Sequence, residues 1–156
     1  MVGMSIFIPP RPKRTAEILA YVEPRGNTVS ESLVNQAREA GPYLTYLALF
    51  SYHANRDGTL TAPPINPLPT VAAQTNASMA MVITNLENDQ FSSDLARDIL
   101  QSAAVQDLLL NNIISEAKRV GNTADIHFDF ERIPGDQREA YNNFLRKAVE
   151  RLHAEG

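Results

Sequence analysis

The sequence of 156 residues contains no cysteine, so it can form neither a disulfide framework nor a thiolate metal site. It also lacks an apolar run near the length of a membrane span and the charged-then-apolar pattern of a signal peptide. Basic residues are fewer than acidic ones, which gives a formal net charge of -4 and a pI of about 5.3. We therefore expect no general affinity for nucleic acid and no membrane partner.

The glycine-rich motifs G-x-G-x-x-G and G-x-x-x-x-G-K-[ST] are absent too, so the usual phosphate-binding signals of nucleotide-binding sheets are missing. What is present is 44% hydrophobic residues, enough to bury one core. Residues 1–14 are predicted to be a start or tag segment that runs into a basic, proline-rich linker. Residues 15–156 are predicted to form one folded domain.

Four apolar, strand-like runs alternate with helical patterns along this domain. The runs are 18–22, 43–52, 79–86 and 125–131, and the helical patterns cover 30–41, 70–75, 92–101, 103–120 and 136–152. Asn88-Asp89, just before Ser92, is interpreted as a helix-capping turn. The alternation predicts an α/β fold, a parallel sheet of (β/α) units with right-handed crossovers.

Two folds fit four such units, a small open α/β sheet or the first half of a TIM (β/α)8 barrel. We favour the half barrel, because barrel enzymes place functional residues at the carboxyl ends of their strands. Glu131 falls at such an end, on the fourth predicted strand.

The fourth run, Asp125–Glu131, alternates polar and apolar residues, and successive side chains of a strand point to opposite faces. One face therefore carries a polar row: His127, Asp129 and Glu131. The other carries bulky apolar groups that imply burial: Ile126, Phe128 and Phe130. Because charged groups are costly to bury unless they are paired or used in chemistry, the polar row is the candidate reaction site.

Two plainer interpretations of the row are a solvated sheet edge and a site for a divalent metal ion. Side chains two residues apart on a strand are separated by about 6–7 Å, so three in a row do not easily reach one ion. We therefore expect no metal and no cofactor. His53 and His153 are expected at the surface.

Asp129-Phe130-Glu131 on a fourth strand resembles the end of the D-x-x-D-x-D-x-E signature of family 18 glycoside hydrolases, the chitinase-like enzymes. The chain is more similar to one branch, the bacterial spore cortex and cell-wall N-acetylglucosaminidases that carry LysM domains ahead of the barrel. Four further segments carry this resemblance, which covers roughly residues 8 to 156: Ile8-Pro9-Pro10-Arg11-Pro12; Phe50-Ser51-Tyr52 with Asp57-Gly58-Thr59-Leu60; Thr84-Asn85-Leu86-Glu87 with Gln90-Phe91-Ser92; and Asp136-Gln137-Arg138-Glu139-Ala140-Tyr141 with Phe144-Leu145-Arg146.

The chain also departs from the family pattern. The earlier aspartates of the signature fall on Ala124 and His127, and His127 is expected to support Asp129 by a hydrogen bond where an acid usually does so. A whole barrel needs about 250 residues, so the resemblance implies that the later strands are absent, with the tyrosine and tryptophan they supply to the sugar pocket. Such a half barrel has open edges, and we expect it to self-associate.

The resemblance implies hydrolysis of N-acetylglucosamine linkages with retention, assisted by the substrate's own N-acetyl group. Glu131 would be the general acid and then the base, kept protonated near neutral pH by partial burial and a neighbouring carboxylate. Asp129 would orient the acetamido group and stabilise the positive intermediate. Tyr21, Phe50 and Asn85 lie near the ends of the first three strands and could line the sugar cleft, although core packing is an equal alternative for the two aromatics.

The expected partner is therefore peptidoglycan or a chitin-like glycan, and the expected location is the spore coat, the cortex or the cell wall. The rival hypothesis is a non-catalytic carbohydrate-binding or structural spore protein. His127 would then mark a degenerate site, or half a barrel would leave the pocket incomplete.

Overall fold

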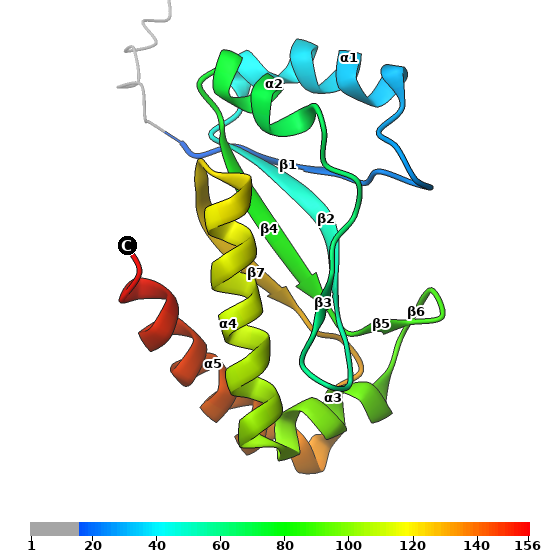
Figure 1. The fold of residues 1–156 in the computed structure, drawn as a ribbon, viewed down its shortest axis with the longest axis vertical. Coiled ribbons are helices and arrows are strands. Elements are labelled where there is room, and N and C mark those ends of the chain that lie inside the picture. The colour runs from blue at the N-terminus through cyan, green and yellow to red at the C-terminus, as the bar shows by residue number, and fades with distance from the viewer. Residues whose placement is uncertain (1–15) are drawn as a thin grey trace, which may run out of the picture.

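The computed structural model describes residues 16–156, so the predicted linker over residues 1–14 lies outside the described residues (Figure 1). The main sheet has four parallel strands in the order β1-β2-β4-β7. Their bounds are β1 Leu19–Val22, β2 Tyr46–Ala54, β4 Ser78–Thr84 and β7 Thr123–Asp129. This topology confirms the predicted α/β fold of parallel strand–helix units.

Five α-helices connect or follow these strands: α1 Glu31–Ala40, α2 Leu68–Gln74, α3 Ser93–Gln101, α4 Ala103–Val120 and α5 Arg138–His153. Serine side chains cap three of them, because the hydroxyls of Ser30, Ser92 and Ser102 accept backbone N–H groups of the first turns of α1, α3 and α4. Figure 1 shows α1 and α2 together beside β1, and α4 next to α5. No helix among residues 16–156 is long and apolar enough to cross a bilayer.

The two faces of the sheet differ in composition, as strand alternation requires. Large side chains such as Leu49 and Met81 pack into the main core with the helices. The opposite face carries small buried residues, Ala48, Ala80 and Val82, with Phe50 partly buried against them. This second face is not covered by a helix within residues 16–156, and it is the face on which the polar side chains of β7 are found.

Two short antiparallel elements are absent from the sequence prediction. Strand β3, Leu60–Thr61, pairs with β2, and β5, Leu86–Glu87, pairs with β6, Gln90–Phe91. The interpretation of Asn88-Asp89 as a helix-capping turn is wrong, because these residues form the two-residue turn of the β5–β6 hairpin. Both have positive φ, 53° and 60°, as a hairpin turn matched to strand twist requires.

The fourth parallel strand also differs in its bounds from the prediction. It was predicted over 125–131, whereas β7 spans Thr123–Asp129. Its ladder with β4 ends at the pair Thr84–Asp129. Phe130 and Glu131 therefore lie beyond the strand, and Arg132 follows with φ of 54°, in the left-handed region.

Candidate active site

The apolar face of β7 packs on α5 as the sequence predicts. The Phe128 ring lies edge-on to Phe144 with centroids 5.2 Å apart, and Phe130 stacks on Tyr141 at 6.2 Å. Ile126 is partly buried against the same core. Because this face is occupied, the polar side chains of β7 are directed to the uncovered face of the sheet.

His127 lies on that uncovered face and contacts Asp125 and Tyr21. Its Nε2 is 3.0 Å from Asp125 Oδ2, and its Nδ1 is 3.5 Å from the Tyr21 hydroxyl. Both ring nitrogens are thus engaged, and the expected hydrogen bond from His127 to Asp129 is not present among residues 16–156. Asp125 and Asp129 are each two residues from His127, so either carboxylate is in reach of the ring, and the structure pairs it with Asp125.

The ring of Tyr21 meets His127 across two intervening strands, β2 and β4. The residues of these strands in register with Tyr21 are Ala48 and Ala80, whose small side chains leave room for the two ring centroids to lie 6.1 Å apart. Phe50 of β2 lies edge-on to Tyr21 at 6.5 Å. The uncovered face of the sheet, called the concave face below, therefore brings together three predicted site residues, from β1, β2 and β7.

The two aromatics differ in exposure, which decides between the expected roles. Tyr21 is 63% exposed, so core packing is excluded for it in this structure. Phe50 is intermediate, partly packed on Ala48, Ala80 and Val82 and partly open. Both present ring surface to the concave face.

Asn85 is placed differently from the expectation. Its side chain is fully buried, so it does not line an open cleft. Its Oδ1 accepts the backbone N–H of Glu131 at 2.9 Å, and its Nδ2 donates to the Glu131 carbonyl oxygen at 3.0 Å. The asparagine thus holds the backbone of the predicted general acid.

Asp129 and Glu131 themselves lie at the carboxyl end of β7. Asp129 is half-buried as the last residue of the strand, whereas Glu131 is exposed, so the partial burial expected for Glu131 is not found. Because Glu131 follows the end of β7, strand alternation no longer determines the direction of its side chain. The structure contains no group of three His, Asp or Glu side chains within residues 16–156 that could hold a metal ion.

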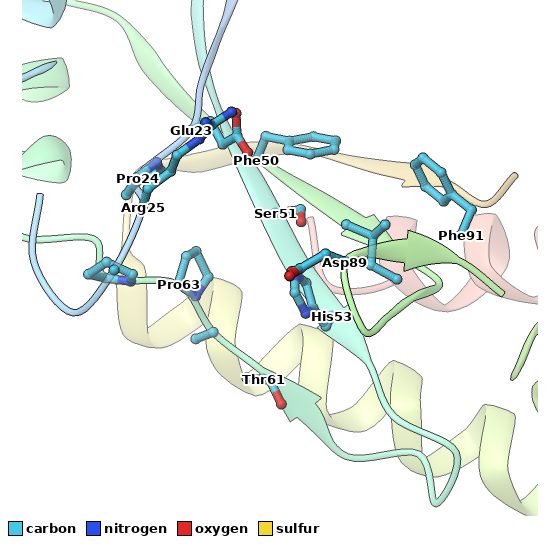
Figure 2. Close-up of a pocket in the computed structure, with 14 residues that line it drawn as sticks. Glu23, Pro24, Arg25, Phe50, Ser51, His53, Thr61, Pro63, Asp89 and Phe91 are labelled. Carbon is cyan, nitrogen blue, oxygen red and sulfur yellow. The ribbon is translucent and has the colours of Figure 1, made fainter.

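A cavity of about 690 Å³ opens at the same edge of the sheet. Figure 2 shows it between the loop after β1 and the β5–β6 hairpin. Phe50 is the one predicted site residue that lines it, and the side chains that sequence reasoning missed include Arg25, His53, Asp89 and Phe91. Arg25, Asp89 and Phe91 belong to the segments that follow β1 and β4, whereas His53 lies on β2. The Asn88-Asp89 turn is the signal that could have found Asp89 and Phe91.

Ion pairs fix the connecting segments around this edge. Arg56, after β2, pairs with Glu87 of β5 at 2.9 Å and with Asp98 of α3. The hydrogen bond from Arg56, together with one from Ser92, lowers the pKa of Glu87 below its usual value. Arg97 of α3 likewise pairs with Asp136 at 2.6 Å, which joins α3 to the turn before α5.

No protein-family model matches the chain. The chain is 53% identical over 148 residues to the cortical fragment-lytic enzyme of Bacillus subtilis, which is 95% of this chain and 34% of that protein. The crystal structure of the Bacillus cereus spore cortex-lytic enzyme SleL superposes with a TM-score of 0.87 at 44% identity, over 94% of this chain and 34% of that one. A chitinase from Chromobacterium violaceum shares the fold, with a TM-score of 0.77 at 19% identity over 91% of this chain and 44% of that one.

The fold therefore matches part of a TIM barrel, as found in family 18 chitinases. More specifically, the chain is homologous to the spore cortex-lytic enzymes called SleL, which confirms the resemblance drawn from the sequence. The chain spans about a third of the length of the curated relatives it matches.

Proposed function

We propose that this chain forms part of the catalytic domain of a glycoside hydrolase that cleaves N-acetylglucosamine linkages in spore cortex peptidoglycan. The observation that carries the proposal is Asp129-Phe130-Glu131 at the carboxyl edge of the sheet, in a chain 53% identical to a cortical fragment-lytic enzyme. The proposed partner is peptidoglycan, and the proposed location is the spore.

The proposed reaction proceeds in two steps, with the substrate supplying the nucleophile. In the first, the Glu131 carboxyl group gives its proton to the glycosidic oxygen while the bond from that oxygen to the anomeric carbon breaks. The acetamido oxygen of the same sugar bonds to the anomeric carbon, which yields an oxazolinium ion. In the second, the Glu131 carboxylate takes a proton from water, and the water oxygen bonds to the anomeric carbon. The bond from the acetamido oxygen to the anomeric carbon breaks, which restores the acetamido group and leaves the anomeric configuration retained.

The surroundings of the two carboxyl groups support different roles for them. Asp129 is half-buried at the end of β7, where its negative charge would act on the oxazolinium ion through a poorly screened medium. Glu131 is exposed in the free protein. A glycan lying over it would exclude water, and desolvation favours the protonated form that a general acid needs.

The second candidate function is non-catalytic binding of the same glycan. The observation that favours it is His127, which stands where the family signature has an acid and which contacts Asp125 and Tyr21. The exposed ring of Tyr21 and the half-exposed ring of Phe50 would serve a binding protein as well as an enzyme.

The test is hydrolysis of cortex fragments, or of a chromogenic N-acetylglucosaminide, by the protein and by Glu131→Gln. General acid–base catalysis contributes about 10²- to 10⁴-fold, so we expect a loss of that size in the variant, with unchanged circular dichroism. Glu139→Gln, an exposed glutamate of α5, is the matched control and should keep full activity. Near-normal turnover by Glu131→Gln would remove Glu131 from its role, and binding without hydrolysis by the unaltered protein would favour the second candidate.

We also propose that the chain self-associates. Within residues 16–156, β1 pairs only with β2 and β7 pairs in parallel only with β4, so both outer edges carry free backbone groups. Such edges are templates for pairing with another chain.

A further inference from the structure

The backbone at Glu131 is held by a side chain in the place where the sheet stops. The β4–β7 ladder ends at Thr84–Asp129, two residues before Glu131. Asn85, the residue after β4, then presents its carboxamide to Glu131 and bonds both the N–H and the carbonyl oxygen, at 2.9 and 3.0 Å. A carboxamide carries the same donor and acceptor as a peptide unit, so it extends the ladder beyond the strand.

Two further hydrogen bonds connect this arrangement to α3. The second N–H of Asn85 Nδ2 donates to the Ser92 carbonyl oxygen at 2.9 Å, and the Ser92 N–H donates to the Asn85 carbonyl oxygen at 3.0 Å. Ser92 is the N-cap of α3. Glu131 is thus tied through one side chain to both the end of β4 and the start of α3.

The next residue is anchored in the same way. The Ser93 hydroxyl donates to the Arg132 carbonyl oxygen at 2.7 Å, directly after Glu131. Arg132 has a φ of 54°, so the chain turns sharply as soon as it has passed Glu131. Asn85 and Ser93 together fix the point at which the chain leaves the strand.

The site requires an asparagine rather than another polar residue. Asn85 is 0% exposed, and each of its side-chain groups has a partner, which removes the cost of burying an amide. An aspartate could accept the Glu131 N–H, but it would offer no donor to the two carbonyl oxygens and would bury a charge. An alanine would leave three backbone groups without this partner.

We propose that Asn85 is the positioning residue for Glu131: its carboxamide fixes the backbone from which the Glu131 carboxyl group reaches the glycosidic oxygen. This inference rests on the proposed function. Displacing a catalytic group by about 1 Å can cost about 100-fold in rate, so loosening this backbone lowers turnover without removing any group that touches the glycan.

The experiment compares Asn85→Ala and Asn85→Asp with Asn112→Ala and Glu131→Gln. Asn112 is the matched control, because its Nδ2 also donates to a backbone carbonyl, that of Gly58, at 2.9 Å and has no contact with Glu131. We expect both Asn85 variants to lower kcat on cortex fragments by about 10- to 100-fold with KM changed less than about 2-fold. Asn112→Ala should change neither constant.

Amide hydrogen exchange at Glu131 gives a second readout that needs no turnover. In the unaltered protein this amide should exchange slowly, because its acceptor is a buried side chain. Exchange should accelerate in Asn85→Ala and less in Asn85→Asp, which keeps the acceptor. Rapid exchange in the unaltered protein would overturn the proposal even if every Asn85 variant failed to fold.

The outcomes separate this inference from the function on which it rests. If Glu131→Gln remains active, the proposed function fails. If Glu131→Gln is inactive while the Asn85 variants keep their kcat, the positioning role alone fails. An equal fall of kcat in Asn112→Ala would also overturn it, because general loss of stability would then explain the effect.

Discussion

Two tyrosines are exposed near the sheet, and of these only Tyr21 contacts other predicted site residues. Tyr21 of β1 is 63% exposed and contacts His127 and Phe50 on the concave face. Tyr43 is 76% exposed and lies in the short 3-10 turn Gly41–Tyr43, which precedes β2 and so belongs to the amino edge. Comparing variants at these two positions therefore distinguishes the loss of a glycan contact from a general effect of removing an exposed ring.

We expect Tyr21→Ala to weaken binding of cortex fragments by about 3- to 10-fold, because stacking on an aromatic ring is worth about 0.5–1.5 kcal/mol. Tyr43→Ala should leave the Kd unchanged. Isothermal titration in a background of Glu131→Gln measures both without hydrolysis. Equal affinities for the two variants would show that the concave face at Tyr21 does not contact the glycan.

Asn85 and Glu131 show what residue patterns leave undetermined. The strand pattern correctly located the polar row and its apolar counterpart, because alternation is a local property of the chain. It did not locate the end of the ladder at Asp129, since a strand ends where its neighbour ends, and that neighbour is distant in sequence. For the same reason the sequence indicated that Asn85 lies near the cleft but not that it is buried under Glu131.

An acidic residue of helix α4 forms ion pairs with helix α5. Asp107 of α4 pairs with Lys147 and Arg151 of α5 at 2.8 and 3.0 Å. The hydrogen bond from Lys147 is the main cause that lowers the pKa of Asp107 below its ordinary value of 3.8. A lowered carboxyl pKa in the folded state stabilises the fold above the unfolded value, and this contribution disappears as the pH falls through the folded value.

We therefore expect Asp107→Asn to lower the Tm slightly at neutral pH and the difference from the unaltered protein to vanish as the pH falls below 3.8. The effect should be small and should shrink with added salt, because the carboxylate is solvent-exposed. Thermal unfolding across this pH range measures it, with Glu150→Gln, an exposed acid of α5, as control. A difference that stays constant at low pH would assign the effect of Asp107→Asn to something other than the ion pairs.

The elements that the sequence predicted well carry their own local signals. Serine N-caps mark the starts of α1, α3 and α4, and apolar runs indicate the four parallel strands. The β5–β6 hairpin was missed because its turn is Asn88-Asp89, without the glycine that usually marks two residues of positive φ. Several of the missed cavity residues come from such connecting segments.

The alternation of strands and helices in the sequence indicated a parallel sheet but not how far the sheet curves. The match to part of a TIM barrel shows that the sheet curves. Because the helices of such a barrel lie outside its strands, the small-residue face, on which Tyr21 contacts His127, is the concave one. That curvature is what a barrel requires and a flat open sheet does not. It also places the residues predicted on β1, β2 and β7 around one concave surface.

An apolar groove lies beside β7. A groove of about 700 Å³ runs between β7, α4 and α5, and its apolar lining includes Ile126, Phe128, Leu145, Val149 and Leu152. Val149 is 52% exposed, and the free edge of β7 lies beside this groove. Because a free strand edge next to apolar surface favours pairing with a second chain, we expect masses above the 17.2 kDa of one chain in light scattering, rising with concentration.

Val149→Lys should shift the mass distribution toward the single chain, since association would bury the charge of the lysine. Tyr43→Lys, at an exposed position away from the groove, should not shift it. A monodisperse monomer at every concentration would show that neither edge of the sheet pairs with another copy.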